Sequence, residues 1–112
     1  MVKTYVADKG DFIWVHFSPQ QGYEQAGRRP GLVITPAAYN LKSGLLLVCP
    51  ITSQQKHYPF EVYFDTAHLS GVVLADQIKS IDWRARQVAF IHKSDPEVCE
   101  RVIALVQATL LP

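Results

Sequence analysis

The stretch Glu24-Gln25-Ala26-Gly27-Arg28-Arg29-Pro30-Gly31-Leu32-Val33-Ile34 decides how this chain begins to fold, because a charged turn in it opens directly onto an apolar strand. Proline at position 30 disfavours helical backbone at Arg29, so Arg29 is expected in extended conformation at the entrance of the strand. Its permanently charged, planar guanidinium group lies five residues after the Glu24 carboxylate. We therefore expect a pre-organised charged site beside a buried strand.

Further apolar runs on both sides of this strand predict a sheet. The expected strands cover residues 12–17, 30–35, 45–50, 60–64, 71–75, 78–81 and 87–91. Glu61 and Tyr63 alternate with apolar neighbours, which is typical of a half-buried strand. Thr35 before Pro36 predicts the N-cap of a short helical turn. The short spacing between strands favours an antiparallel sheet or a small barrel.

Only the last segment has the pattern of a substantial helix. Ser94 and Glu97 have the spacing of a capping box at its start. Apolar positions then recur at helical spacing, at Val98, Val102, Leu105, Val106 and Thr109. We expect this face to lie across the sheet.

The composition describes one ordinary folded domain, residues 1–112, with 48% hydrophobic and 19% charged residues. The net charge of +1 excludes strong nucleic-acid binding through bulk charge. Any contact with RNA or DNA must therefore be local.

Cysteine usage and apolar runs indicate the compartment. Cys49 and Cys99 stand in apolar contexts and form no Cys-x-x-Cys motif, so both are expected to be buried thiols in a reducing compartment. The N-terminus has no signal-peptide pattern, and the longest apolar run, residues 45–49, is too short to span a bilayer. We expect a soluble, cytoplasmic protein.

A hydroxyl group ends the third expected strand in the run Pro50-Ile51-Thr52-Ser53. If this strand neighbours the one after Arg29, the two side chains converge near an acid, which suits a reaction at phosphorus. The four histidines, His16, His57, His68 and His92, show no metal-ligand spacing. We expect no metal and no cofactor.

Four motifs give the chain a resemblance to a known family. They are Gly10-Asp11-x-Ile13-Trp14-Val15, Glu24-Gln25-Ala26-Gly27-x-Arg29-Pro30, Tyr58-Pro59-Phe60-Glu61-Val62 and Leu74-Ala75-Asp76-Gln77-x-Lys79-Ser80-Ile81-x-Trp83-Arg84-Ala85-Arg86. In this order and spacing the chain resembles the MazF/PemK-family toxins, the endoribonuclease half of bacterial toxin–antitoxin pairs. The resemblance covers roughly the first four-fifths of the chain and fades in the final helix.

The resemblance implies a fold, an activity and partners. The implied fold is mainly β, an SH3-like small antiparallel barrel of the CcdB/PemK type with the C-terminal helix packed on the sheet. The implied activity is sequence-specific, metal-independent cleavage of single-stranded mRNA, leaving 2′,3′-cyclic phosphate and 5′-hydroxyl ends and stopping growth. A homodimer and a neutralising MazE-like antitoxin are implied as well. We expect an extended acidic and apolar antitoxin segment to cover the cationic site.

By the same resemblance, Arg29 and Thr52 occupy the positions of the family's essential arginine and threonine, and Glu24 that of its active-site acid. The very high pKa of arginine favours charge stabilisation for Arg29, with hydrogen bonding to phosphate for Thr52. Glu24 is then the candidate general base.

Two further groups of residues are assigned around this site. Expected RNA contacts are Gln25, Arg28, Lys56, Gln77 and Lys79. Expected contacts with a dimer partner or antitoxin are Trp83, Arg84 and Arg86. Trp83 lies in a predicted turn, where an exposed indole marks an interface, whereas Trp14 lies mid-strand and is expected in the core.

Two other readings remain open from the sequence. A toxin of the same fold, such as CcdB, acts by binding DNA gyrase and needs no catalytic residues. A non-catalytic β-barrel module that binds peptide or RNA is the other alternative. Cleavage of RNA in the presence of a chelator would separate all three.

Overall fold

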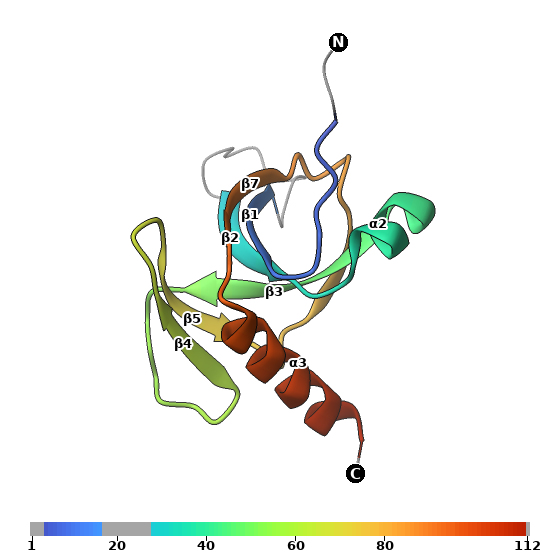
Figure 1. The fold of residues 1–112 in the computed structure, drawn as a ribbon. Coiled ribbons are helices and arrows are strands. Elements are labelled where there is room, and N and C mark those ends of the chain that lie inside the picture. Colours follow the sequence, from blue (N-terminus) through green and yellow to red (C-terminus); the bar gives the residue numbers. More distant parts are fainter. Residues whose placement is uncertain (1–3, 17–27, 112) are drawn as a thin grey trace.

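The computed structural model describes residues 4–16 and 28–111, and its centre is a curled antiparallel sheet followed by a helix (Figure 1). The strands are β1 Asp11–His16, β2 Arg28–Val33, β3 Leu45–Thr52, β4 Glu61–Asp65, β5 Ser70–Leu74, β6 Lys79–Asp82 and β7 Ala89–Lys93. The helices are α2 Ala37–Ser43 and α3 Pro96–Leu110. Each predicted strand is present, with its described bounds shifted by at most two residues.

The sheet is organised around β3, the longest strand described. Its hydrogen-bonded order is β4-β5-β3-β2-β1-β7, and β6 also pairs with β3. Both β5 and β6 can do so because they pair with opposite ends of β3: β6 with Leu45 to Val48, and β5 with Ile51 and Thr52. The end of β3 is therefore the place where the β4–β5 hairpin joins the rest of the sheet.

Two apolar clusters lie on the two faces of the curled sheet. One contains Phe12, Leu32 and Val62 and is covered by α3 through Val102 and Val106. The other includes Ile13, Val15 and Trp83. Adjacent residues of β1 thus belong to different clusters, so this strand is buried on both faces.

The predicted apolar face of α3 is confirmed, but the predicted capping box is wrong. Val102 and Val106 are buried, whereas Thr109 is exposed. Asp95 is the N-cap and makes no side-chain capping bond. Ser94 lies one residue before the N-cap, and its backbone N–H donates to Gly10 O at 2.8 Å, which keeps it beside the sheet.

The start of α2 also differs from the prediction. Thr35 does not cap the helix, since its hydroxyl donates to Asn40 Oδ1 at 2.7 Å. The N–H of Ala37 is instead accepted by Asp8 Oδ1 at 2.8 Å, from a residue 29 positions away in the chain. A capping partner so distant in sequence leaves no local signal.

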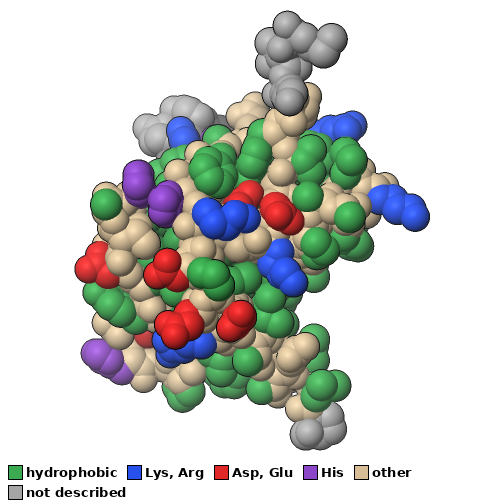
Figure 2. All heavy atoms as spheres, in the orientation of Figure 1, with side chains coloured by type: hydrophobic (Ala, Val, Ile, Leu, Met, Phe, Trp, Pro, Cys, Tyr) green, Lys and Arg blue, Asp and Glu red, His purple; other side chains and the backbone are tan. Residues whose placement is uncertain are grey.

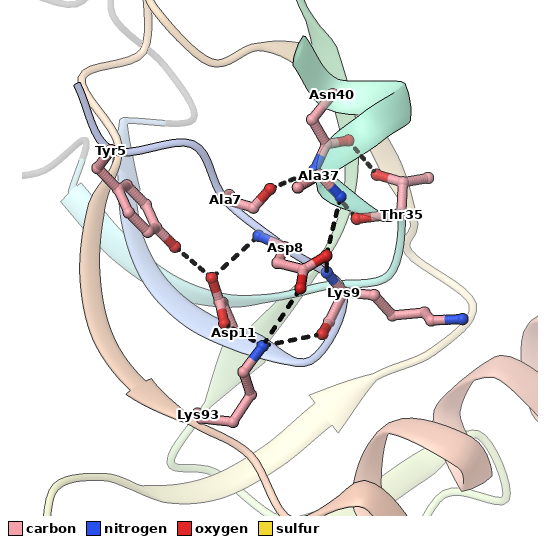
Figure 3. Close-up of polar contacts among 9 residues, drawn as sticks. All are labelled: Tyr5, Ala7, Asp8, Lys9, Asp11, Thr35, Ala37, Asn40 and Lys93. Carbon is pink, nitrogen blue, oxygen red and sulfur yellow. Dashed lines mark hydrogen bonds and ion pairs between the residues drawn. The ribbon is translucent and has the colours of Figure 1, made fainter. Parts of the chain in front are cut away.

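Asp8 and Asn40 belong to a polar network near the start of the chain, drawn in Figure 3, that also contains Tyr5, Asp11 and Lys93. Asp11 accepts from the Tyr5 hydroxyl at 2.6 Å and pairs with Lys93 Nζ at 2.6 Å. Burial, and then the hydrogen bond to Asp11, raises the pKa of Tyr5. The network joins β1, β7 and the start of α2.

Both cysteines are free and buried, as predicted. Burial raises the pKa of the Cys49 thiol to about 12, so this side chain packs as a small apolar group. Across the residues that the structure describes, no helix has the length and apolar character needed to cross a membrane.

Candidate functional site

An open groove of about 530 Å³ lies at the end of β3. Arg29 and Thr52 line it together with the 53–60 loop, which contributes Gln54, Lys56, His57 and Tyr58. The turn after β5 contributes Asp76 and Gln77. Within the described part of the chain, this is where the predicted catalytic pair meets.

Strand pairing explains why Arg29 and Thr52 converge. Strands β2 and β3 are antiparallel, with Gly31 paired to Pro50. Arg29 and Thr52 each lie two residues beyond this pair, at the same end of the two strands. The condition set by the sequence, that these two strands be neighbours, is confirmed.

The Thr52 hydroxyl retains the capacity to donate a hydrogen bond. Its Oγ1 accepts the N–H of Gln54 at 3.2 Å, and the side chain is half-buried at the groove. Its hydroxyl proton can therefore be directed towards an anionic oxygen in the groove.

Gly71 allows β5 to approach Thr52 closely. Its φ is +149°, a backbone conformation that favours glycine, and a Cβ at this position would lie 2.5 Å from the Thr52 carbonyl oxygen. Any side chain at residue 71 would therefore push the backbone of Thr52 out of place. Gly71 was not identified from the sequence.

The carboxylate of Glu61 holds two backbone N–H groups of the 53–60 loop. Both oxygens of Glu61 accept the N–H of Lys56, at 3.1 and 3.2 Å, and Oε1 also accepts the N–H of Tyr58 at 3.4 Å. His57 between them adopts a left-handed conformation with φ 58°. These contacts fix a turn that would otherwise have few partners.

A hydrogen bond joins the two sides of the groove. The Tyr58 hydroxyl donates to Asp76 Oδ2 at 2.9 Å, linking the 53–60 loop to the turn after β5. This hydrogen bond, more than any other effect, raises the pKa of Tyr58, so the phenol remains a donor. Glu61, Tyr58 and Asp76 stand in the recognised motifs, but no role was assigned to them from the sequence.

The predicted RNA contacts divide into three sets. Lys56 and Gln77 line the groove. Arg28 and Lys79 are exposed outside its lining, at the first residues of β2 and β6, and the Arg28 guanidinium lies 4.8 Å from the Trp14 ring centroid. Gln25, like the predicted base Glu24, lies outside the described residues.

The expectation of an exposed indole at position 83 is wrong. Trp83 is 3% exposed, belongs to a core cluster and donates its indole N–H to Asn40 O at 2.8 Å. Trp14, expected in the core, is only partly buried. The turn prediction at 83 was sound, but turns of a curled sheet can fold inwards, and the local sequence does not reveal their direction.

The other two residues of the expected interface group lie around the same turn. Arg84 is exposed, with its guanidinium 4.9 Å from the Trp83 ring centroid. Arg86 is partly buried and donates to His16 O at 3.2 Å. Arg84 is thus the more accessible of the two.

The electrostatics of the groove suit a polyanion held locally. The face in Figure 2 carries acidic and basic side chains intermixed, in keeping with the net charge of +1. Within the groove, Glu61 and Asp76 already accept hydrogen bonds from the protein, whereas Arg29 and Lys56 are exposed. Among residues 4–16 and 28–111, no group of three or more His, Cys, Asp or Glu side chains could hold a metal ion.

Sequence comparisons give this geometry a context. A family model described as the PemK-like, MazF-like toxin of type II toxin–antitoxin systems matches residues 8–110. The endoribonuclease toxin MazF of Escherichia coli K12 is 56% identical over 110 residues, covering 98% of this chain and 99% of that relative. The endoribonuclease PemK of E. coli is 38% identical over 108 residues, covering 92% and 81% respectively.

Comparison with solved structures points to the same family. MazF of Deinococcus radiodurans superposes with a TM-score of 0.86 at 45% identity, over 96% of this chain and 98% of that chain. A MazE–MazF complex from the same organism gives a TM-score of 0.85 at 41% identity, over 96% and 97%. The expected small barrel with a C-terminal helix is thereby confirmed.

Proposed function

Because this chain belongs to the PemK-like and MazF-like toxins of type II toxin–antitoxin systems and is an endoribonuclease, we propose that Arg29 and Thr52 carry its chemistry. The two non-catalytic readings, gyrase binding and a simple binding module, are set aside by this membership. The reaction is metal-independent cleavage of single-stranded mRNA at short sequences. It yields 2′,3′-cyclic phosphate and 5′-hydroxyl ends and inhibits growth.

The convergence of Arg29 and Thr52 at one end of the groove carries this proposal. The 2′-oxygen of the RNA attacks the neighbouring phosphorus, and negative charge accumulates on the non-bridging oxygens. The bond from phosphorus to the 5′-oxygen then breaks, and this oxygen takes up a proton and leaves as the 5′-hydroxyl end. Arg29 offsets that charge with a permanent planar cation, and the Thr52 hydroxyl donates a hydrogen bond to the same group. Glu24, outside the described residues, is the proposed acceptor of the 2′-hydroxyl proton.

The remaining assignments follow the path of an extended RNA strand. Lys56 and Gln77 contact the strand inside the groove, supported by their place in its lining. Arg28 and Lys79 are the proposed contacts outside the groove lining, and Gln25, outside the described residues, is a further proposed contact. Phosphate contacts of this kind set affinity, whereas amide contacts to base edges set sequence preference.

The proposed partners are a second copy of the chain and an antitoxin. The MazE–MazF complex of D. radiodurans supports a MazE-like antitoxin for this chain. An extended acidic and apolar antitoxin segment would neutralise the cationic groove, with Arg84, Arg86 and the turn at Trp83 near the interface. We also propose that residues 1–112 form a single toxin domain, since the family match spans residues 8–110. This domain acts on mRNA in the bacterial cytoplasm.

The test is cleavage of a long single-stranded RNA in EDTA, followed by analysis of the product ends. Wild-type protein should leave cyclic phosphate ends. Arg29→Ala and Thr52→Val should each lower turnover on the order of 100-fold, because each removes a group that stabilises the transition state.

Matched controls are Arg101→Ala and Thr109→Val on the exposed side of α3, outside the groove lining. Both should cleave as wild type does. Cleavage that requires an added divalent ion would contradict the metal-independent mechanism. Full turnover by the Arg29 or Thr52 variant would contradict the residue assignment.

A further inference from the structure

The 53–60 loop presents to the groove an aromatic ring that the proposed chemistry does not use. Tyr58 lines the groove and is 48% exposed. It also stands in the motif Tyr58-Pro59-Phe60-Glu61-Val62, to which the catalytic scheme assigns no role. Covering a large exposed ring with a flat apolar partner is energetically favourable.

Three contacts hold Tyr58 in place, two through its side chain and one through its backbone. Its hydroxyl donates to Asp76 Oδ2 at 2.9 Å, and its centroid lies 5.7 Å from that of Phe60, with the ring planes inclined at 46°. The backbone N–H of Tyr58 donates to Glu61 Oε1 at 3.4 Å. A ligand that stacks on this ring therefore loses little additional side-chain freedom on binding.

We infer that Tyr58 is a stacking platform for one base of the bound RNA strand. The inference rests on the proposed function, since it assumes an RNA strand in the groove. Arg29 and Lys56 supply positive charge for the phosphate groups of the RNA, and Tyr58 adds an aromatic face on which a nucleobase can stack. This combination of a cationic groove and exposed aromatic rings is how proteins hold single-stranded nucleic acid.

Asp76 is a positioning residue in this scheme. It touches the Tyr58 hydroxyl and not the base, so it acts by fixing the orientation of the ring. Gln77, its neighbour in the turn, also lines the groove and carries an amide able to bond to a base edge. One turn thus fixes the ring that stacks and supplies a group that can read the base.

The experiment uses an RNA that binds but cannot be cut. After the wild-type cleavage position has been mapped, an oligonucleotide with a 2′-deoxy sugar at that nucleotide is prepared, with an abasic site at each position in turn. One abasic site should weaken binding to wild-type protein on the order of 10-fold. The same site should have less than a twofold effect on Tyr58→Leu, which has no ring, and an intermediate effect on Tyr58→Phe, which keeps the ring but loses the hydrogen bond to Asp76.

A spectroscopic measurement separates stacking from general loop order. The fluorescence of 2-aminopurine at the sensitive position should be quenched on binding to wild-type protein, more weakly on binding to Tyr58→Phe, and not on binding to Tyr58→Leu. Tyr63→Leu is the matched control, because Tyr63 is 54% exposed on β4 and lies outside the groove lining. For Asp76→Asn, we expect weaker quenching with the same sensitive position.

The inference is overturned if Tyr58→Leu suffers the same abasic penalties as wild type or quenches 2-aminopurine equally. It is also overturned if no abasic site affects wild-type binding. Either result, with wild-type cleavage in EDTA intact, leaves the proposed function standing. Loss of wild-type cleavage itself would remove both.

Discussion

Asp11 in the polar network is 4% exposed, with one oxygen bonded to Tyr5 and the other to Lys93, whereas Arg29 and Lys56 are exposed along an open groove. Both regions are rich in charged and hydroxyl side chains. In the network these groups are bonded mainly to one another, so they stabilise the fold. In the groove, the acids Glu61 and Asp76 serve the protein while the cations face outwards, which leaves positive charge for a ligand.

The first prediction concerns Asn40, at the α2 side of the network, and has the largest expected effect. Asn40 is fully buried, and its side chain bonds to Ala7 O, Thr35 O and the Thr35 hydroxyl. Asn40→Ala removes all three of these buried hydrogen bonds and should lower the free energy of unfolding by about 3 kcal/mol. Urea denaturation measures this loss.

Tyr39→Ala, at a neighbouring position that is 43% exposed, is the control and should cost much less. Turnover per folded Asn40→Ala molecule should equal that of wild type, because the network lies outside the groove. A variant as stable as wild type would break the comparison.

The second prediction concerns the carboxylate that orders the groove loop. Glu61→Gln loses one of the two oxygens that accept the Lys56 N–H. Amide exchange at Lys56 and Tyr58 should accelerate roughly 10-fold, equivalent to about 1.4 kcal/mol, while the free energy of unfolding changes less. Hydrogen exchange followed by NMR resolves the two amides.

Glu100→Gln, at an exposed position of α3, should leave both exchange rates unchanged. If Glu61→Gln instead destabilised the whole protein as strongly as Asn40→Ala, Glu61 would belong with the structural acids and not with the groove.

The third prediction concerns the cationic edge beyond the groove. Arg28→Ala should weaken RNA binding and reduce the slope of log affinity against log salt concentration by about 1, since one phosphate contact is lost. Turnover at saturating RNA should stay within about twofold of wild type, because Arg28 is outside the groove lining. Arg101→Ala is the control. Unchanged affinity with collapsed turnover would refute the assignment.

The fourth and smallest effect is the pH dependence of the network. The hydrogen bond from the Ala37 N–H, more than any other effect, lowers the pKa of Asp8 below its usual value near 4. Its ionised form therefore stabilises the fold above about pH 4, and that contribution disappears as the pH falls through the lowered pKa.

Asp8→Asn should accordingly cost less than about 1 kcal/mol at neutral pH, because the side chain is about half exposed. The difference from wild type should shrink as the pH falls below about 4 in acid denaturation curves. Asp65→Asn, on the exposed side of β4, should show no such convergence. A difference that grows on acidification would reverse the sign argued here.

Much of the fold was predictable because its signals are local. Alternation at Glu61 and Tyr63 and the helical spacing of Val102 and Val106 each identify an element and its buried side. The failures involve partners distant in sequence. Asp8 caps a helix 29 residues away, and Trp83 turns inwards to meet Asn40, so neither could be inferred from neighbouring residues.

The site was predictable only in part for the same reason. Arg29 and Thr52 were assigned together by the family resemblance, and the expectation that they converge held because β2 pairs with β3 and brings the two strand ends together. Glu61 and Asp76 resembled ordinary surface acids, since their role depends on the backbone of Lys56 and the hydroxyl of Tyr58. Gly71 left no signal at all, because its role is to leave space.

That space gives a bacterium a simple means of disarming the toxin. A methyl group at residue 71 would meet the Thr52 carbonyl and shift the hydroxyl away from its target, with every groove side chain unaltered. Glycine and alanine codons differ by a single nucleotide, so inactivation is within easy mutational reach. Bacterial genomes should therefore contain alleles that encode an inactive toxin although every groove residue is intact.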